Sequence, residues 1–152
     1  MNTNEFYSQE LEEILENHEI PDENPAETQG NYIKRKCREF LNEMVLHFST
    51  NPRAIDSNGR CVYSHSVNGG CAIGRKVSED LAYLFDYIEA EVGYNLTVSN
   101  KRIFNLLPLE LSMLGSSFLK ECQSLHDNNY WDEKGLSPQG KTFFDMIVER
   151  YC

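Results

Sequence analysis

Cys61-Val-Tyr-Ser64 and Gly69-Gly-Cys-Ala-Ile-Gly-Arg75 are the stretches that decide the fold, because they interrupt an otherwise helical pattern. They belong to two β-like runs, 60–64 and 71–77, with a cysteine near the start of each. Asn68-Gly-Gly70 between them supplies residues that adopt positive φ readily, as a tight reversal requires. We therefore predict a β-hairpin, which must pack on helices because an isolated hairpin is only marginally stable in water.

Apolar residues elsewhere recur at helical spacing. The strongest periodic signal covers residues 32–49 and stops at Asn51-Pro52, because the residue before a proline avoids the α conformation. Capping serines predict helices after Ser78 and after Ser137-Pro138, where the proline suits a first helical turn. Apolar residues at helical spacing predict another helix over 111–125, and a short apolar run predicts a third short strand within 94–101. The predicted fold class is α+β and mostly helical, with about four helices around a small β-hairpin or short antiparallel sheet.

Acidic residues are concentrated at the N-terminus. Residues 1–30 hold nine acidic residues and no Lys or Arg, while the whole chain has a net charge of −10. Residues 6–17 have an amphipathic helical pattern, and the segment 20–30 contains two prolines and almost no apolar residues. We predict two parts: an acidic N-terminal helix and linker over 1–30, and a single globular helical domain with the β-hairpin over 31–152.

Charge and hydropathy argue against several classes of protein. A nucleic-acid-binding protein normally presents a basic face, whereas the basic cluster Lys34-Arg35-Lys36 with Arg38 fits a solvated helix face. No apolar run approaches the roughly twenty residues of a membrane span, and the N-terminus lacks the features of a signal peptide. We expect no direct nucleic-acid binding, no membrane association and a cytoplasmic location.

The five cysteines, an odd number at wide spacing, fit free thiols in a reducing compartment. Cys61 and Cys71 could combine with His65, and with His47 or His126, as zinc ligands. Structural zinc sites usually use ligand pairs separated by about two to four residues, whereas nine residues separate Cys61 from Cys71. We expect no metal or other cofactor, and it stays open whether these two thiols are free, bridged or metal-bound.

The segment from Gly69 to Lys76 partly matches a phosphate-binding loop. The match fails for nucleotide hydrolases, which need Lys followed by Ser or Thr directly after the second glycine. A weaker anion site stays open, in which basic side chains face phosphates and an aromatic ring stacks on a base: Arg60, Tyr63, Arg75, Lys76 and Trp131. This gives an alternative function, sequestration of a small anionic nucleotide-type ligand. Gly74 alternatively marks a bulge or a packing contact.

His126-Asp127 matches the dyad of metal-dependent phosphohydrolases, to which His47 and Asp145 could add ligands. A metal-dependent hydrolase around His126-Asp127 is therefore a second alternative function. In the structural alternative both residues close the fourth helix, with the histidine near its negative end. No nucleophile elbow, zincin motif or dinucleotide glycine fingerprint is present in the sequence. The residues favour a protein that is not an enzyme, and we assign no catalytic residue.

Several short motifs share an order with known proteins. They are Cys61-Val-Tyr63, Gly70-Cys-Ala-Ile-Gly74, Leu106-Leu-Pro108, Gln123-Ser-Leu-His-Asp127 after Leu119, and Trp131. In this order they resemble a loose group of small uncharacterised proteins of bacteriophages and prophages. The resemblance covers about residues 55–140 and implies a viral source, and small phage proteins of this kind often bind a host protein or a signalling molecule.

The leading hypothesis is a non-enzymatic phage accessory protein that binds and inhibits a host factor, with an anti-defence inhibitor as one form of this role. Its partner would be a protein in the cytosol of the host cell. The acidic N-terminal part would complement a basic surface of that partner, with Glu12, Glu13 and Glu16 as contact residues. The sequence fixes neither the identity of the partner nor the oligomeric state.

Overall fold

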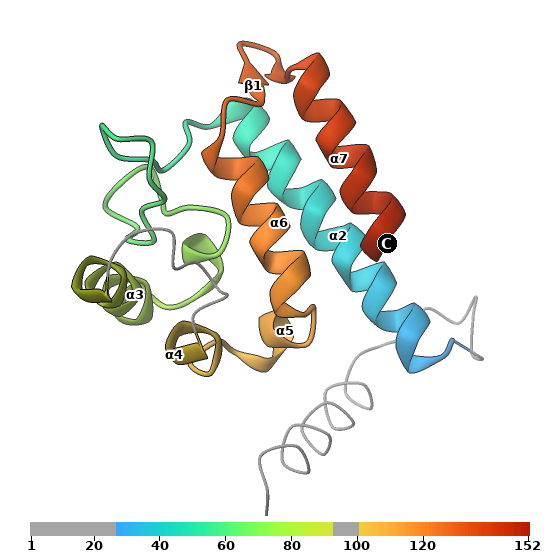
Figure 1. Cartoon of the computed structure of the whole chain (residues 1–152), viewed down its shortest axis with the longest axis horizontal. Coiled ribbons are helices and arrows are strands. Elements are labelled where there is room, and N and C mark those ends of the chain that lie inside the picture. The colour runs from blue at the N-terminus through green and yellow to red at the C-terminus, as the bar shows by residue number, and fades with distance from the viewer. Residues whose placement is uncertain (1–26, 93–100) are drawn as a thin grey trace, which may run out of the picture.

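The computed structural model describes residues 27–92 and 101–152 (Figure 1). This part of the chain is mostly helical and carries a small two-stranded antiparallel sheet, which confirms the predicted fold class. Its elements, labelled as in Figure 1, are α2 (Gln29–Thr50), the 3₁₀-helix η1 (Gly74–Lys76), α3 (Glu79–Val92), α4 (Lys101–Phe104), α5 (Leu109–Ser112), α6 (Ser116–Asp127), β1 (Trp131–Asp132), β2 (Gly135–Leu136) and α7 (Pro138–Tyr151).

Helix α2 is the longest described element and lies beside α6 and α7 (Figure 1). The hydroxyl of Thr28 caps its start by accepting a hydrogen bond from the Asn31 N–H at 3.1 Å. Its end falls just before Pro52, as predicted. The buried face of α2 packs on α6, where the rings of Phe40 and Phe118 meet edge to face at 6.0 Å. These three helices share one apolar core with buried residues of the 54–77 segment, α3, α4 and α5.

The predicted hairpin over 60–64 and 71–77 is wrong. In this region the described chain forms one isolated bridge, between Ile55 and Cys61, followed by turns and η1. The single described two-stranded sheet lies elsewhere, at β1 and β2.

Side-chain and backbone packing around Tyr63 explain the difference. The Asp86 carboxylate accepts the backbone N–H groups of Tyr63 and Ser64 at 2.8 and 2.9 Å, so these donors need no partner strand. Gly70 and Gly74 then let the chain wrap closely around the Tyr63 backbone, because a Cβ at either glycine would collide with the Tyr63 carbonyl oxygen. Gly74 is therefore a packing contact, one of the two structural roles considered for it.

The predicted helix over 111–125 is divided into α5 and α6. Helix α5 ends at Ser112, and Gly115, with a φ of 91°, is the residue that directly precedes α6. The Leu-Thr-Val run predicted as a third short strand within 94–101 is not among the described residues, and Lys101 begins α4.

The strands β1 and β2 pair antiparallel, with Trp131 opposite Leu136. The reversal uses Gly135 at a φ of 121°. The hydroxyl of Ser137 then caps α7 by accepting the Gly140 N–H at 3.1 Å, as predicted from Ser137-Pro138. This small hairpin covers the ends of α2 and α6 (Figure 1).

The predicted acidic helix over 6–17, with Glu12, Glu13 and Glu16, lies outside the described residues. Among the described helices, none has the length and apolar composition needed to cross a bilayer.

Candidate functional site

The basic pair predicted to face phosphates is neutralised within the protein. The Arg75 guanidinium binds the Glu43 carboxylate with two bonds, at 2.7 and 2.5 Å, and Lys76 adds a contact of 3.1 Å. These cations hold the pKa of Glu43 at about 2. Arg75 is only 12% exposed and lies over the Phe48 ring at 5.7 Å. A phosphate at this place would have to displace Glu43 from both basic residues.

The two aromatic residues predicted to stack on a base, Tyr63 and Trp131, instead pack within the protein. Tyr63 is fully buried, and its hydroxyl donates to Glu89 at 2.8 Å. Trp131 is half-buried, donates through Nε1 to the Leu125 carbonyl oxygen at 2.8 Å and packs against Phe48. Trp131 is thus a cover over helix ends, and Tyr63 offers no face to a ligand.

The five predicted ligand residues therefore divide into two groups. Arg75 and Trp131 both contact Phe48, and Lys76 joins Arg75 on Glu43. Arg60 and Tyr63 instead lie with Glu89, the first beside it in a cavity and the second hydrogen-bonded to it. The described contacts do not bring the five residues together around one ligand.

The His126-Asp127 dyad is a structural element of the core. His126 is fully buried, and its Nε2 accepts the Ala54 N–H at 3.3 Å. Nδ1 therefore carries the proton and donates it to Asp127 at 2.6 Å. Arg53 closes the network by donating to the carbonyl oxygens of His126 and Asn128, both at 2.8 Å. Both ring nitrogens of His126 are in use, so this side chain has no lone pair left for a metal.

The zinc ligands considered from the sequence are also not assembled. Cys61 and Cys71 are free thiols, and burial raises the pKa of Cys61 well above its usual value. His65 is bonded through Nε2 to the Gly74 carbonyl oxygen at 2.7 Å. Among the residues that the structure describes, no group of three or more His, Cys, Asp or Glu side chains is placed to hold a metal ion.

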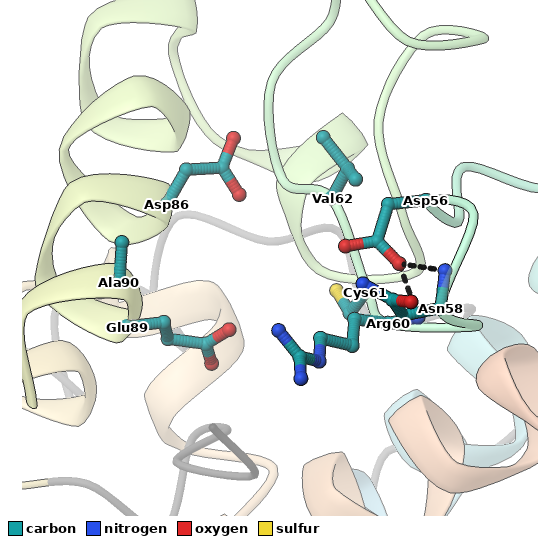
Figure 2. Close-up of a pocket in the computed structure, with 8 residues that line it drawn as sticks. All are labelled: Asp56, Asn58, Arg60, Cys61, Val62, Asp86, Glu89 and Ala90. Carbon is teal, nitrogen blue, oxygen red and sulfur yellow. Dashed lines mark hydrogen bonds between the residues drawn. The ribbon is translucent and has the colours of Figure 1, made fainter. Parts of the chain in front are cut away.

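A cavity of about 460 Å³ lies between α3 and the loop before Tyr63 (Figure 2). Its wall combines three carboxylates with one guanidinium and a thiol: Asp56, Asn58, Arg60, Cys61, Val62, Asp86, Glu89 and Ala90. In Figure 2 the Arg60 side chain extends from the loop toward Glu89 on α3. The volume falls in the range of roughly 300–1,000 Å³ of small-molecule sites, so this cavity has room for a foreign group.

Helix α3 contributes two carboxyl groups to this cavity, those of Asp86 and Glu89, and burial raises the pKa of both. Burial raises the pKa of Glu89 to about 7, and the nearby negative charges of Asp127 and Asp86 add to the rise, although the Tyr63 hydrogen bond opposes it. Burial also raises the pKa of Asp86, against its two backbone donors. Glu89 is consequently divided between its neutral and charged forms near neutral pH.

This pKa makes a prediction for stability. The glutamate titrates near 4.5 in the unfolded chain and near 7 in the folded protein, so the folded state holds the extra proton between these values. The free energy of unfolding should therefore fall as the pH rises from about 4.5 to 7. Glu89→Gln keeps an acceptor for Tyr63 and should raise stability at pH 8 by roughly 1–2 kcal/mol after solvent screening, with little effect at pH 4.5.

Urea unfolding of the wild type and of Glu89→Gln at pH 4.5 and 8 checks this prediction. Glu110→Gln, at an exposed position, is the matched control and should change stability equally at both pH values. A stability difference between wild type and Glu89→Gln that is the same at both pH values would contradict the assignment.

Next to the cavity, α3 presents an exposed apolar face. We call this face the tyrosine ridge; its members are Tyr83, Leu84 and Tyr87, which are 70%, 41% and 62% exposed. Asp86 and Ala90 on the cavity wall follow Tyr83 and Tyr87 by three residues each, and residues three apart on a helix are neighbours on its surface. The ridge and the cavity are therefore neighbouring parts of one surface.

Two spacings in the sequence of α3 indicate this surface, although it was not among the predicted sites. Tyr83 and Tyr87 are four residues apart, and Asp86 and Glu89 three apart, so each pair lies on one side of a helix. The helix carries five acidic residues and no Lys or Arg. Two tyrosines on the acidic, polar side of an amphipathic helix are unusual for a face that only contacts solvent. This combination is the sequence feature that indicates an interaction surface.

Comparisons of the chain with protein-family models, with curated proteins and with solved structures give no match.

Proposed function

We propose that this protein is a non-enzymatic binding protein that uses α3 to hold a partner protein with a basic surface. The tyrosine ridge is the observation that carries the proposal. Tyrosine is among the residues that dominate binding energy at protein interfaces, because it adds a large apolar area and a hydroxyl at a low entropic cost. Tyr83 and Tyr87 lie about one helical turn apart and are mostly exposed, so both rings can contact a partner at the same time.

Charge supports a basic partner. Helix α3 has five acidic residues and no basic one, and the whole chain has a net charge of −10. Such a surface attracts a basic protein and speeds its association, whereas it repels the phosphates of nucleic acids. The acidic residues Glu12, Glu13 and Glu16 would add to the same attraction from the N-terminal part of the chain.

The resemblance to phage proteins supports a host protein as the partner and inhibition of that protein as the outcome. Covering a basic surface would inhibit a host factor that uses this surface on nucleic acid, and a defence protein is one such factor. Nucleotide capture has less support because Glu43 occupies Arg75 and Lys76. A hydrolase at His126-Asp127 has less support because both ring nitrogens of the histidine are bonded.

The test is a comparison of surface variants in bacterial cells that express the tagged full chain. The double variant Tyr83→Ser/Tyr87→Ser should lose the partner that the wild type retains, and the Kd for the purified pair should rise by about 100-fold or more, since two anchor residues are removed. Leu46→Ser is the matched control, because Leu46 is 71% exposed but lies on α2. Equal partner recovery with the double variant and the wild type would contradict the proposal.

A further inference from the structure

We infer that the cavity beside α3 receives an arginine side chain of the partner, so that the tyrosine ridge and the cavity dock one basic segment together. This inference rests on the proposed function and names the chemistry of the partner. It follows from three features of the described residues: the room in the cavity, the excess of carboxylates on its wall, and the position of the tyrosine ridge beside it on α3.

The carboxylates of the cavity are held in fixed positions. Asp86 accepts two backbone N–H groups, and one oxygen of Asp56 accepts those of Asn58 and Arg60 at 2.8 and 3.0 Å. Glu89 accepts the Tyr63 hydroxyl at 2.8 Å. Because these bonds already order the wall, an entering cation does not have to order it, which lowers the cost of binding.

The charge of the wall selects a cation. Three carboxylates face one guanidinium, that of Arg60, so the negative groups remain in excess when all three are ionised. Arg60 also shows that a guanidinium fits between the loop and Glu89 (Figure 2). Arginine is favoured over lysine because its planar guanidinium binds carboxylates with two hydrogen bonds and also stacks on tyrosine rings, which α3 carries beside the cavity.

The geometry of α3 links the two parts of the surface. Asp86 on the cavity wall lies about one helical turn from Tyr83, and Ala90, also on the wall, lies about one turn from Tyr87. An apolar side chain of the partner on the tyrosines would thus leave a neighbouring arginine next to the cavity mouth. One segment with adjacent apolar and arginine residues can fill both places.

Occupancy should also depend on pH. A cation in the cavity favours the charged form of Glu89, whose pKa is about 7 in the free protein. The described titratable or charged groups near Glu89 are Tyr63, Arg60, Cys61, Asp86 and Asp127. The affinity for an arginine probe should therefore rise between pH 6 and 8 by up to about tenfold, with Glu89 the group that releases the proton.

The experiment uses N-acetyl-arginine amide as the probe and the uncharged citrulline analogue as its matched control. Both are titrated into the full chain while backbone amide signals are followed by NMR. The arginine probe should shift the signals of residues 56–62 and 86–90 with a pH-dependent affinity, and the citrulline analogue should not. Glu89→Gln should abolish the pH dependence and weaken binding, whereas Glu110→Gln should leave both unchanged.

The outcomes separate this inference from the proposed function. If the arginine probe shifts no signal in these segments, or shifts them no more than citrulline does, the inference is wrong even where Tyr83→Ser/Tyr87→Ser loses the partner. If the probe binds as expected but the double variant retains the partner, the proposed function fails and the cavity stands alone as an arginine site. A dimer of the free protein that the double variant dissociates would overturn both, because a second copy would then occupy the ridge.

Discussion

Gly74→Val is expected to lower the free energy of unfolding by about 3 kcal/mol or more, the largest effect of any single substitution considered for this protein. Gly74 is buried, and a Cβ there would meet the carbonyl oxygen, Cα and carbonyl carbon of Tyr63. These are backbone atoms tied by Asp86, so they cannot move aside cheaply. Overpacking of this kind costs about 1–3 kcal/mol in ordinary cores, and a collision with fixed backbone belongs at or above the upper end.

Thermal and urea unfolding measure this effect, which should appear as a fall in Tm of about 10 °C. Gly30→Ala is the matched control, since Gly30 lies in the first turn of α2 and an added Cβ has its nearest contact at 4.0 Å. Alanine favours the helix there and should leave stability equal or slightly higher. A Gly74→Val protein that unfolds like the wild type would show that the close approach to Tyr63 is absent.

His126→Ala is expected to have the second largest effect, a loss of about 3 kcal/mol. The substitution removes a fully buried ring that packs on Phe48 with centroids 4.6 Å apart. It also leaves the Ala54 N–H and the Asp127 carboxyl without their partner in the interior. An unpaired buried polar group costs about 1–3 kcal/mol, and the cavity adds to this cost.

His47→Ala is the matched control, because His47 is half-buried and lies outside this network; it should cost about 1 kcal/mol or less. Adding EDTA provides a second measurement. If His126 stabilises the core as described, a chelator leaves the Tm of the wild type unchanged. A Tm that falls with EDTA and recovers with a divalent metal would favour the hydrolase hypothesis instead.

The sequence predicted the helices that carry their own end signals. Helix α2 ends before Pro52 and α7 begins at Ser137-Pro138, where local chemistry fixes the backbone. The predicted helix over 111–125 is divided between Ser112 and Ser116, where Gly115 has a positive φ; in the sequence this glycine could not be distinguished from one tolerated inside a helix.

The hairpin prediction failed because its β-like residues are satisfied by distant partners. Tyr63 and Ser64 give their N–H groups to Asp86, more than twenty residues away, and the glycines that indicated a reversal serve to approach the Tyr63 backbone. Local patterns do not contain such long-range contacts. The same limit applies to Arg75 and Lys76, whose phosphate-binding appearance is cancelled by Glu43 on a different helix.

The surface on α3 was missed for a related reason. Asp86 and Glu89 look like ordinary solvent-facing acids in the sequence, and only the fold places them against Arg60 and Tyr63 in a cavity wall. The exposure of Tyr83 and Tyr87 likewise depends on which side of α3 the core covers. Hydrophobic periodicity distinguishes the apolar side of a helix from its polar side. It does not show which aromatic residues the rest of the protein leaves exposed to solvent.

Site-specific photocrosslinking in bacterial cells tests the central claim most directly, because it reports which face of the folded protein touches a partner. A photoreactive phenylalanine is placed at Tyr83 in one variant and at Leu46, equally exposed on α2, in another. We predict a discrete crosslinked product of a basic protein from position 83 and none from position 46. Crosslinks to that protein from position 46 with none from position 83 would show that α3 is not the surface through which this protein acts.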